Sequence, residues 1–345
     1  MFENASRTEV SLLGEFGLID HLSQNFTSKQ ASTLKGIGDD AAVLEKDAEN
    51  VTLVSTDLLI EGVHFDLHYM PLKHLGYKAV TVNLSDIYAM NGIPEQITVS
   101  LAFSNRFSLE AIEELYSGIK HACDFYGIDL VGGDTSSSHS GLMLSVTAIG
   151  TCRKDAVVYR SGAQEHDLIC VTGDLGAAYL GLQLLEREKK IFLENPGAQP
   201  DLEGFDYILE RQLKPEARRD MIQFLHDKKL KPTAMMDISD GLSSELHHIA
   251  KQSNVGITIY EDKLPIDAIV YNNAQELGLE STTCALNGGE DYELLFTVPQ
   301  SMFEQIKGVE GISIIGHCNM AGTGIHLISK AGTQYPLPAQ GWTNM

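Results

Sequence analysis

Hydrophobic positions along the chain follow two different periods. Short runs in which apolar residues dominate or occupy every second position, several of them rich in Val, Ile and Thr, predict β-strands. These runs cover residues 51–57, 96–104, 142–151, 167–173, 255–260, 292–298 and 312–318. Between them, apolar residues recur at spacings of three and four, which indicates amphipathic helices.

Seven segments carry the helical pattern. They are residues 71–91, 108–126, 175–189, 215–228, 242–253, 267–277 and 299–306. In the second segment Leu115 and Ile119 belong to an apolar stripe, Ser108 stands at the N-cap position, and Gly127 follows the last turn. Its two ends are therefore the best defined.

Strands that alternate with helices predict a mixed α/β fold. The polar stretch 153–167 separates a strand-rich first half from a second α/β half. We therefore expect an N-terminal domain over residues 1–152 and a C-terminal domain over residues 153–345. Residues 192–206 contain Pro and Gly and predict a surface excursion.

The charge of the chain narrows the range of partners. With 25 basic and 47 acidic residues the formal net charge is −22, which disfavours nucleic acid and anionic membranes as partners. No apolar run reaches the roughly 20 residues that span a bilayer, and the N-terminal stretch lacks the apolar core of a signal peptide. We therefore expect a cytoplasmic protein.

The cysteines do not form a recognisable framework. Cys123, Cys152, Cys170, Cys284 and Cys318 lie far apart and include no C-x-x-C pair. This pattern disfavours both disulfides and a zinc site, so we expect buried, inert thiols.

Six acidic motifs place carboxylates beside glycine, serine or threonine, mostly after an apolar run. They are GIGDD (36–40), STD (55–57), NLSD (83–86), GGDT (132–135), DISDG (237–241) and GGED (288–291). An Asp at the carboxyl end of a strand points into the crevice where α/β proteins bind ligands. One Asp-Gly pair is more often a turn than a site, but six such motifs together predict a Mg²⁺ site with oxygen ligands.

Asp237 and Asp240 are three residues apart, directly before a helical pattern. Side chains at i and i+3 share a helix face, and the positive end of the helix dipole stabilises both charges. An N-cap and a first-turn acid without metal explain the spacing equally well. The other acidic motifs favour the metal.

Familiar phosphate-binding sequences are absent. The chain contains no G-x-x-x-x-G-K-[ST] and no HRD or DFG motif, which excludes the P-loop and protein-kinase folds. The GIGDDA sequence (36–41) imitates a dinucleotide fingerprint, but two carboxylates would lie where the pyrophosphate binds. It therefore fails as such a fingerprint.

Nine motifs, taken in order, resemble the thiamine-monophosphate kinase family. They are GEFGLI (14–19), GIGDDAAVL (36–44), STDLLIEGVHF (55–65), YKAVTVNLSDIYAMNG (77–92), LVGGDTS (130–136), RSGA (160–163), VTGDLGAAYLGL (171–182), DISDGL (237–242) and NGGEDYELLFTV (287–298). The resemblance implies the two-domain fold of the aminoimidazole ribonucleotide synthetase superfamily, whose N-terminal domain dimerises through its sheet. It also implies a homodimer that converts ATP and thiamine monophosphate into ADP and thiamine diphosphate.

The resemblance further implies roles for individual residues. Magnesium ligands would be Asp40, Ser55, Thr56, Asp57, Asp86, Asp134, Asp237 and Asp240, with Asp57, Asp86, Asp134 and Asp240 as the catalytic residues. Nucleotide contacts would come from Ser55, Thr56, Tyr116, Gly133, Asp134, Arg160 and Ser239. The thiamine end would be bound by His64, Glu290 and Trp342, the single tryptophan offering a cation–π contact to the thiazolium ring.

The proposed acceptor needs no general base, because a phosphate monoester is largely dianionic at neutral pH. The obstacle is repulsion between two polyanions, which several Mg²⁺ ions and Arg160 would offset.

Two features depart from the family pattern, and alternatives stay open. Residues 136–139 (SSSH) stand where many relatives have a basic residue, and the 192–206 excursion is long. Another ATP-using member of the superfamily, close to aminoimidazole ribonucleotide synthetase, remains possible on these motifs. So do a metal-dependent phosphohydrolase and a sensor that binds Mg·ATP without turnover.

Overall fold

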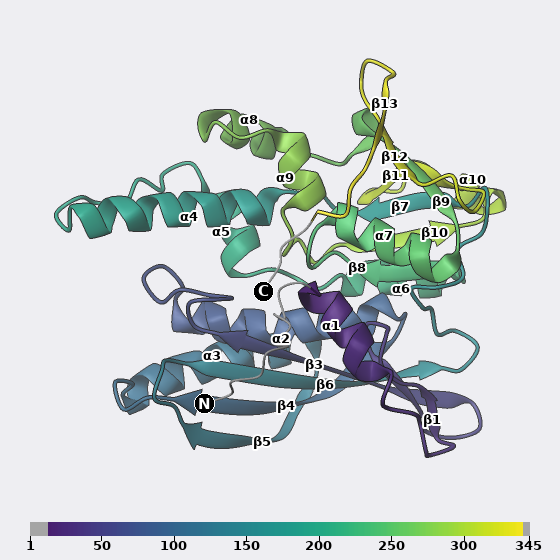
Figure 1. Ribbon diagram of the computed structural model, residues 1–345. Coiled ribbons are helices and arrows are strands. Elements are labelled where there is room, and N and C mark those ends of the chain that lie inside the picture. The colour runs from purple at the N-terminus through teal and green to yellow at the C-terminus, as the bar shows by residue number, and fades with distance from the viewer. Residues whose placement is uncertain (1–12, 341–345) are drawn as a thin grey trace, which may run out of the picture.

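The strands of the first part form one six-stranded sheet. The structure is a computed structural model that describes residues 13–340 (Figure 1). The strands are β1 (Thr33–Lys35), β2 (Ala42–Glu45), β3 (Asn50–Ile60), β4 (Ile93–Phe103), β5 (Asp129–Ser137) and β6 (Met143–Arg153). Their order in the sheet is β1-β2-β3-β6-β4-β5, and β5 forms one edge, paired in parallel with β4.

The second part is built on a seven-stranded sheet of order β13-β12-β9-β11-β7-β10-β8. Its strands are β7 (Leu168–Thr172), β8 (Ala234–Asp237), β9 (Gly256–Tyr260), β10 (Leu294–Val298), β11 (Ile312–Asn319), β12 (Ile325–Ile328) and β13 (Gln334–Pro336). Its helices are α4 (Ala177–Glu194), α5 (Asp206–Leu213), α6 (Arg219–Lys228), α7 (Leu242–Ser253), α8 (Ala268–Glu276), α9 (Ser281–Asn287) and α10 (Phe303–Ile306).

Helix α2 (Leu72–Ala89) joins the two parts, with α1 (Gly14–Ser23) and α3 (Leu109–Tyr126) as the other helices of the first part. Buried residues occur all around α2, as expected for a helix enclosed by protein. Its core cluster also contains Met235 and Phe296 of the second sheet. Figure 1 shows α2 between the two sheets. The helix therefore lies where the two parts meet.

Two glycines allow α2 and α3 to cross closely. A Cβ on Gly76 would lie 2.0 Å from the carbonyl oxygen of Leu115, and one on Gly118 would lie 1.9 Å from that of Lys73. Real Cβ atoms do not approach this closely, so the crossing requires glycine at both positions.

The structure confirms the mixed α/β class and the seven predicted strands, whose ends shift by at most three residues. The Ser108 cap is also confirmed, because its hydroxyl accepts from the backbone N–H of Ala111 and Gly127 is left-handed. The predicted helix 175–189 instead runs to Glu194, inside the expected excursion. The predicted helix 299–306 is α-helical only in its last turn.

Among residues 13–340, no helix has both the length and the apolar character needed to cross a bilayer. All five cysteines are buried and free, as predicted.

Candidate active site

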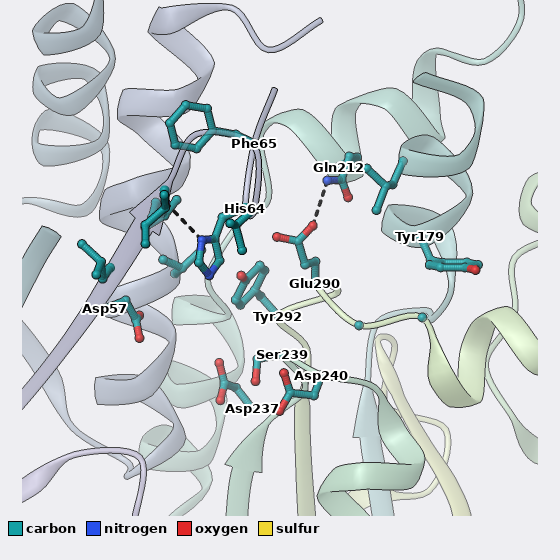
Figure 2. Close-up of a pocket in the computed structure, with 18 of the residues that line it drawn as sticks. Asp57, His64, Phe65, Tyr179, Gln212, Asp237, Ser239, Asp240, Glu290 and Tyr292 are labelled. Carbon is teal, nitrogen blue, oxygen red and sulfur yellow. Dashed lines mark hydrogen bonds between the residues drawn. The ribbon is translucent and has the colours of Figure 1, made fainter. Parts of the chain in front are cut away.

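A cavity of about 1030 Å³ lies between the two parts of the chain. The first part lines it with strand β3, the loop after β3 and helix α2, and the second part lines it with α4 and with the loops after β8 and before β10. Figure 2 shows Asp57, Asp237 and Asp240 at one end of this space and His64 and Glu290 nearer the other. The cavity therefore has an acidic end and a mixed polar end.

Three carboxylates converge at the acidic end. Asp40, Asp86 and Asp237 each offer one oxygen, and these oxygens lie within 4.8 Å of one another. Asp40 comes from the loop before β2, Asp86 from the last turn of α2, and Asp237 from the end of β8. Asp57 and Asp240 line the same cavity.

Neutral hydrogen-bond partners orient this cluster. The Ser55 hydroxyl donates to Asp86 Oδ2, and the Ser85 hydroxyl donates to Asp237 Oδ2 at 2.6 Å. The backbone N–H of Asp57 donates to the side-chain oxygen of Asn83 at 3.0 Å. Serines fix carboxylates without neutralising them, so the charges stay available to a cation.

Arg160 contacts the cluster from one side only. Its Nε and Nη2 donate to Asp40 Oδ1 at 2.9 and 2.5 Å, and its backbone N–H donates to Asp39 at 3.0 Å. Asp40 Oδ2 is buried and has no hydrogen-bond partner within residues 13–340. One oxygen of Asp40 is thus held by arginine, and the other lacks a ligand.

The pKa values indicate that Arg160 supplies too little positive charge to balance this cluster. Burial raises the pKa of Asp57 to about 6. Burial, followed by the charge of Asp40, raises the pKa of Asp237 to about 7. Burial and the charges of Asp57 and Asp237 raise the pKa of Asp86 well above its usual value. Each shift means that the ionised cluster needs a counter-charge.

Glu290 is held from two sides at the other end of the cavity. Lys78 lies 2.9 Å from its Oε1, and the Gln212 amide donates to its Oε2 at 2.8 Å (Figure 2). The Nδ1 of His64 accepts from the backbone N–H of Ile60 at 3.1 Å. In its neutral form this imidazole therefore carries its proton on Nε2 and can donate from that atom.

Comparison with known proteins gives one consistent result. The family "AIR synthase related protein" matches with its N-terminal domain over residues 38–152 and its C-terminal domain over residues 164–306. The thiamine-monophosphate kinase of Bacillus subtilis (strain 168) is 38% identical over 295 residues, which are 86% of each chain. That of Escherichia coli (strain K12) is 34% identical over 83% of each chain.

The chain belongs to the thiamine-monophosphate kinase family. A solved structure described as "AaThiL complexed with AMPPCP and TMP" superposes with a TM-score of 0.84 and 33% identity. It covers 99% of this chain and 100% of that one. The predicted family membership and two-domain fold are confirmed.

In this member of the thiamine-monophosphate kinase family, most of the predicted site residues line the cavity between the two parts of the chain. They are Asp40, Ser55, Thr56, Asp57, His64, Asp86, Arg160, Asp237, Ser239, Asp240 and Glu290. Asp134 and Gly133 instead lie exposed on the edge strand β5. Tyr116 lines a separate surface groove with Lys120 and Leu130. Trp342 lies outside the described residues.

Two local expectations were wrong. Asp57 and Asp134 lie within β3 and β5, and Asp86 lies on a helix, so these carboxylates do not follow strand ends. Asp237 and Asp240 do not share a helix face, because Asp237 ends β8 and Asp240 precedes Gly241, the N-cap of α7. Among Asp57, Asp86, Asp134 and Asp237, only Asp237 lies at the carboxyl end of a strand, as expected.

Two residues that bear on the cavity were missed from the sequence: Glu245, which lines it, and Lys78, which contacts the cavity residue Glu290. Glu245 is buried in the first turn of α7 and its Oε1 accepts from the backbone N–H of Asp240 at 2.9 Å. Lys78 lies in an apolar helical stretch, where a lysine is unexpected unless it has a partner. The position of Lys78 within an apolar helical stretch could therefore have been noticed in the sequence.

Proposed function

We propose that this chain transfers the γ-phosphoryl group of ATP to the phosphate of thiamine monophosphate. A phosphate oxygen of the acceptor forms the new P–O bond, the bond between the γ-phosphorus and the β–γ bridging oxygen breaks, and ADP leaves. The observation that carries the proposal is the full-length match to a structure described with AMPPCP and TMP. The acidic cavity supports it, because its cluster can serve two anionic groups only with added cations.

The donor set fits Mg²⁺. Asp40, Asp86 and Asp237 offer converging oxygens, and the Oδ2 of Asp40, which has no hydrogen-bond partner among the described residues, is an acceptor that a cation would satisfy. Asp57 and Asp240, together with Ser55 and Thr56 of β3, would complete the coordination. When bound, Mg²⁺ would neutralise charge on the phosphate oxygens and hold the donor and acceptor groups together.

The side chains of the cavity would orient the reactants. Arg160 keeps Asp40 in one orientation, and Ser85 does the same for Asp237 across the boundary between the two parts. His64 and Glu290 are placed to bind the acceptor away from the phosphates, and Ser239 to contact the nucleotide. No base is assigned, since the acceptor oxygen is already ionised.

A homodimer would explain the residues that lie outside the cavity. Asp134 and Gly133 are exposed on β5, at the open edge of the first sheet, beside the groove that contains Tyr116. Leu130 and Val131 on the same strand are also exposed. If two first sheets meet along this edge, Asp134, Gly133 and Tyr116 of one protomer would serve the cavity of its partner.

The domain boundary at residue 152 and the cytoplasmic location stay predictions.

A phosphoryl-transfer assay tests the proposal. The purified protein is given ATP, Mg²⁺ and thiamine monophosphate, and the thiamine and nucleotide products are separated by chromatography. We expect equal amounts of thiamine diphosphate and ADP, abolished by Asp57→Asn and unchanged by Asp124→Asn at an exposed position of α3. Phosphate release without thiamine diphosphate would overturn the proposal in favour of a hydrolase, and nucleotide binding without turnover would favour a sensor.

A further inference from the structure

Helix α2 contains a lysine that is almost fully enclosed by protein. The Lys78 side chain is 1% exposed, among apolar neighbours such as Tyr77, Ala79 and Val80. A buried ammonium is costly unless it is paired and hydrogen-bonded. Its position therefore calls for an explanation from its partners.

Both partners of Lys78 come from the second part of the chain. Its Nζ lies 2.9 Å from Glu290 Oε1 and donates to the backbone carbonyl of Gln212 at 3.1 Å. The Gln212 amide in turn donates to Glu290 Oε2 at 2.8 Å. The three residues form a closed network in which each carboxylate oxygen of Glu290 has its own donor.

Glu290 is also fixed at its backbone. Its φ is +58°, in the left-handed region, and its N–H donates to the carbonyl of Ser239 at 2.7 Å. The preceding residue, Gly289, has φ +71°, and a Cβ there would lie 2.7 Å from the same carbonyl. The loop before β10 is thus held against the loop after β8, and the Glu290 side chain, 26% exposed, faces the cavity (Figure 2).

Lys78 and Asp86 lie on the same helix, eight residues apart. At the rise of an α-helix this separates them by about 12 Å along the axis. Asp86 belongs to the acidic cluster at one end of the cavity, and Lys78 holds Glu290 at the other. One rigid element therefore sets the distance between the metal-binding end and the acceptor-binding end.

We propose that Lys78 is a positioning residue for the acceptor: it fixes the carboxylate of Glu290 across the boundary between the two parts. This inference rests on the proposed function and adds to it. Lys78 itself does not line the cavity, so it acts through Glu290. Because both oxygens of Glu290 are already partly engaged, the carboxylate serves as a directed hydrogen-bond acceptor for the substrate rather than as a free negative charge.

Four proteins test the proposal: wild type, Lys78→Met, Glu290→Gln and the double variant. Methionine keeps most of the unbranched side-chain volume and removes the ammonium. We expect Lys78→Met to raise the KM for thiamine monophosphate about tenfold or more, and to leave the KM for ATP within about twofold. In the double variant we expect the acceptor KM of Glu290→Gln alone, because Glu290→Gln has already removed the carboxylate that Lys78 positions, so the further loss of Lys78 has no added effect.

Three kinetic results would overturn the proposal: an unchanged acceptor KM in Lys78→Met, equal increases in both KM values, or effects that multiply in the double variant. If Lys78→Met does not fold but the double variant folds with the acceptor KM of Glu290→Gln, the pairing is supported, since only the single variant leaves the Glu290 carboxylate without its ammonium partner. If neither folds, Lys78 supports the fold independently of Glu290 and the proposal fails. A wild-type protein without turnover would overturn the proposed function and this inference with it.

Discussion

The hydroxyl of Ser85 donates a 2.6 Å hydrogen bond to Asp237 Oδ2, linking α2 of the first part to β8 of the second. Ser85 is fully buried and stands next to Asp86, which belongs to the same acidic cluster. The two parts of the chain therefore meet at the carboxylates themselves. Any shift between the parts would change the spacing of the cluster.

Replacing Ser85 by alanine tests this link. Without the hydroxyl, Asp237 loses the donor that orients it, and the affinity for Mg²⁺ should fall by about 10- to 100-fold. Calorimetric titration with Mg²⁺ measures the affinity, and the Mg²⁺ dependence of the transfer rate provides a second readout. Ser23→Ala is a matched control, because that serine on α1 donates to the backbone carbonyl of Asp20 in its own helix and does not line the cavity. Equal Mg²⁺ affinities in Ser85→Ala and wild type would contradict the role of Ser85 in orienting Asp237.

The sequence predicted the elements that depend on local pattern. Strands with clear apolar runs and a helix with an N-cap serine and a C-terminal glycine were located well, since short-range chemistry determines them. Six strands were missed. Five of them, β1, β2, β8, β12 and β13, have only three or four residues each, and pairing with neighbours stabilises them more than their own sequences do. The sixth is the longer edge strand β5.

The cavity could be predicted only in part, for a physical reason. The acidic motifs identified the carboxylates, but the bonds from Ser85 to Asp237 and from Lys78 to Glu290 join residues more than 150 positions apart. Such contacts depend on how the two sheets pack on α2, which no local pattern encodes. The position of Asp134 on an edge strand is of the same kind, because GGDT reads as a turn until β4 pairs with it.

The five cysteines should be inert in the native protein. Burial raises the pKa of the Cys123, Cys152 and Cys284 thiols to about 11 and that of Cys318 to about 12, and it also raises that of Cys170. At pH 8 the reactive thiolate is therefore scarce as well as shielded. We expect Ellman's reagent to react slowly with the folded protein and to titrate five thiols in guanidinium. A Cys123→Ser control should titrate one fewer, and a thiol that reacts within seconds in the native state would contradict the structure.

Asp291 should make stability depend on pH. Its Oδ2 accepts from the backbone N–H of Gly176 at 2.9 Å, and burial raises its pKa to about 7 although Arg211 opposes the shift. The folded protein then binds a proton that the unfolded chain has released above about pH 4. This contribution to stability is complete below that pH and is lost as the pH rises through 7.

Asp291→Asn keeps an acceptor for the Gly176 N–H but cannot ionise. The free energy of unfolding of wild type should therefore fall relative to that of the variant by about 1 kcal/mol or more between pH 5.5 and 8.5. Urea unfolding followed by circular dichroism at a series of pH values measures the difference. The exposed Asp124→Asn variant should run parallel to wild type, and a parallel curve for Asp291→Asn would show that Asp291 is ionised in both states.

Mixed dimers can decide whether Asp134 serves the partner's cavity. Asp57 lines the cavity of its own chain, whereas Asp134 is exposed on the open edge of the sheet. Asp57→Asn and Asp134→Asn should each abolish transfer as homodimers. A dimer with one variant chain of each kind would then contain one cavity with both carboxylates intact and one with neither.

After statistical mixing half of the dimers are mixed, so about one quarter of the wild-type activity should return. Co-expression with two different affinity tags allows the mixed dimer to be isolated, and on its own it should show about half of the wild-type activity. A mixture of Asp57→Asn with Asp86→Asn is the control that should stay inactive, because both residues line the cavity of the same chain. Continued inactivity of the Asp57→Asn and Asp134→Asn pair would place Asp134 in the site of its own chain or outside any site, and would remove the argument that two sheets must meet along β5 for the enzyme to work.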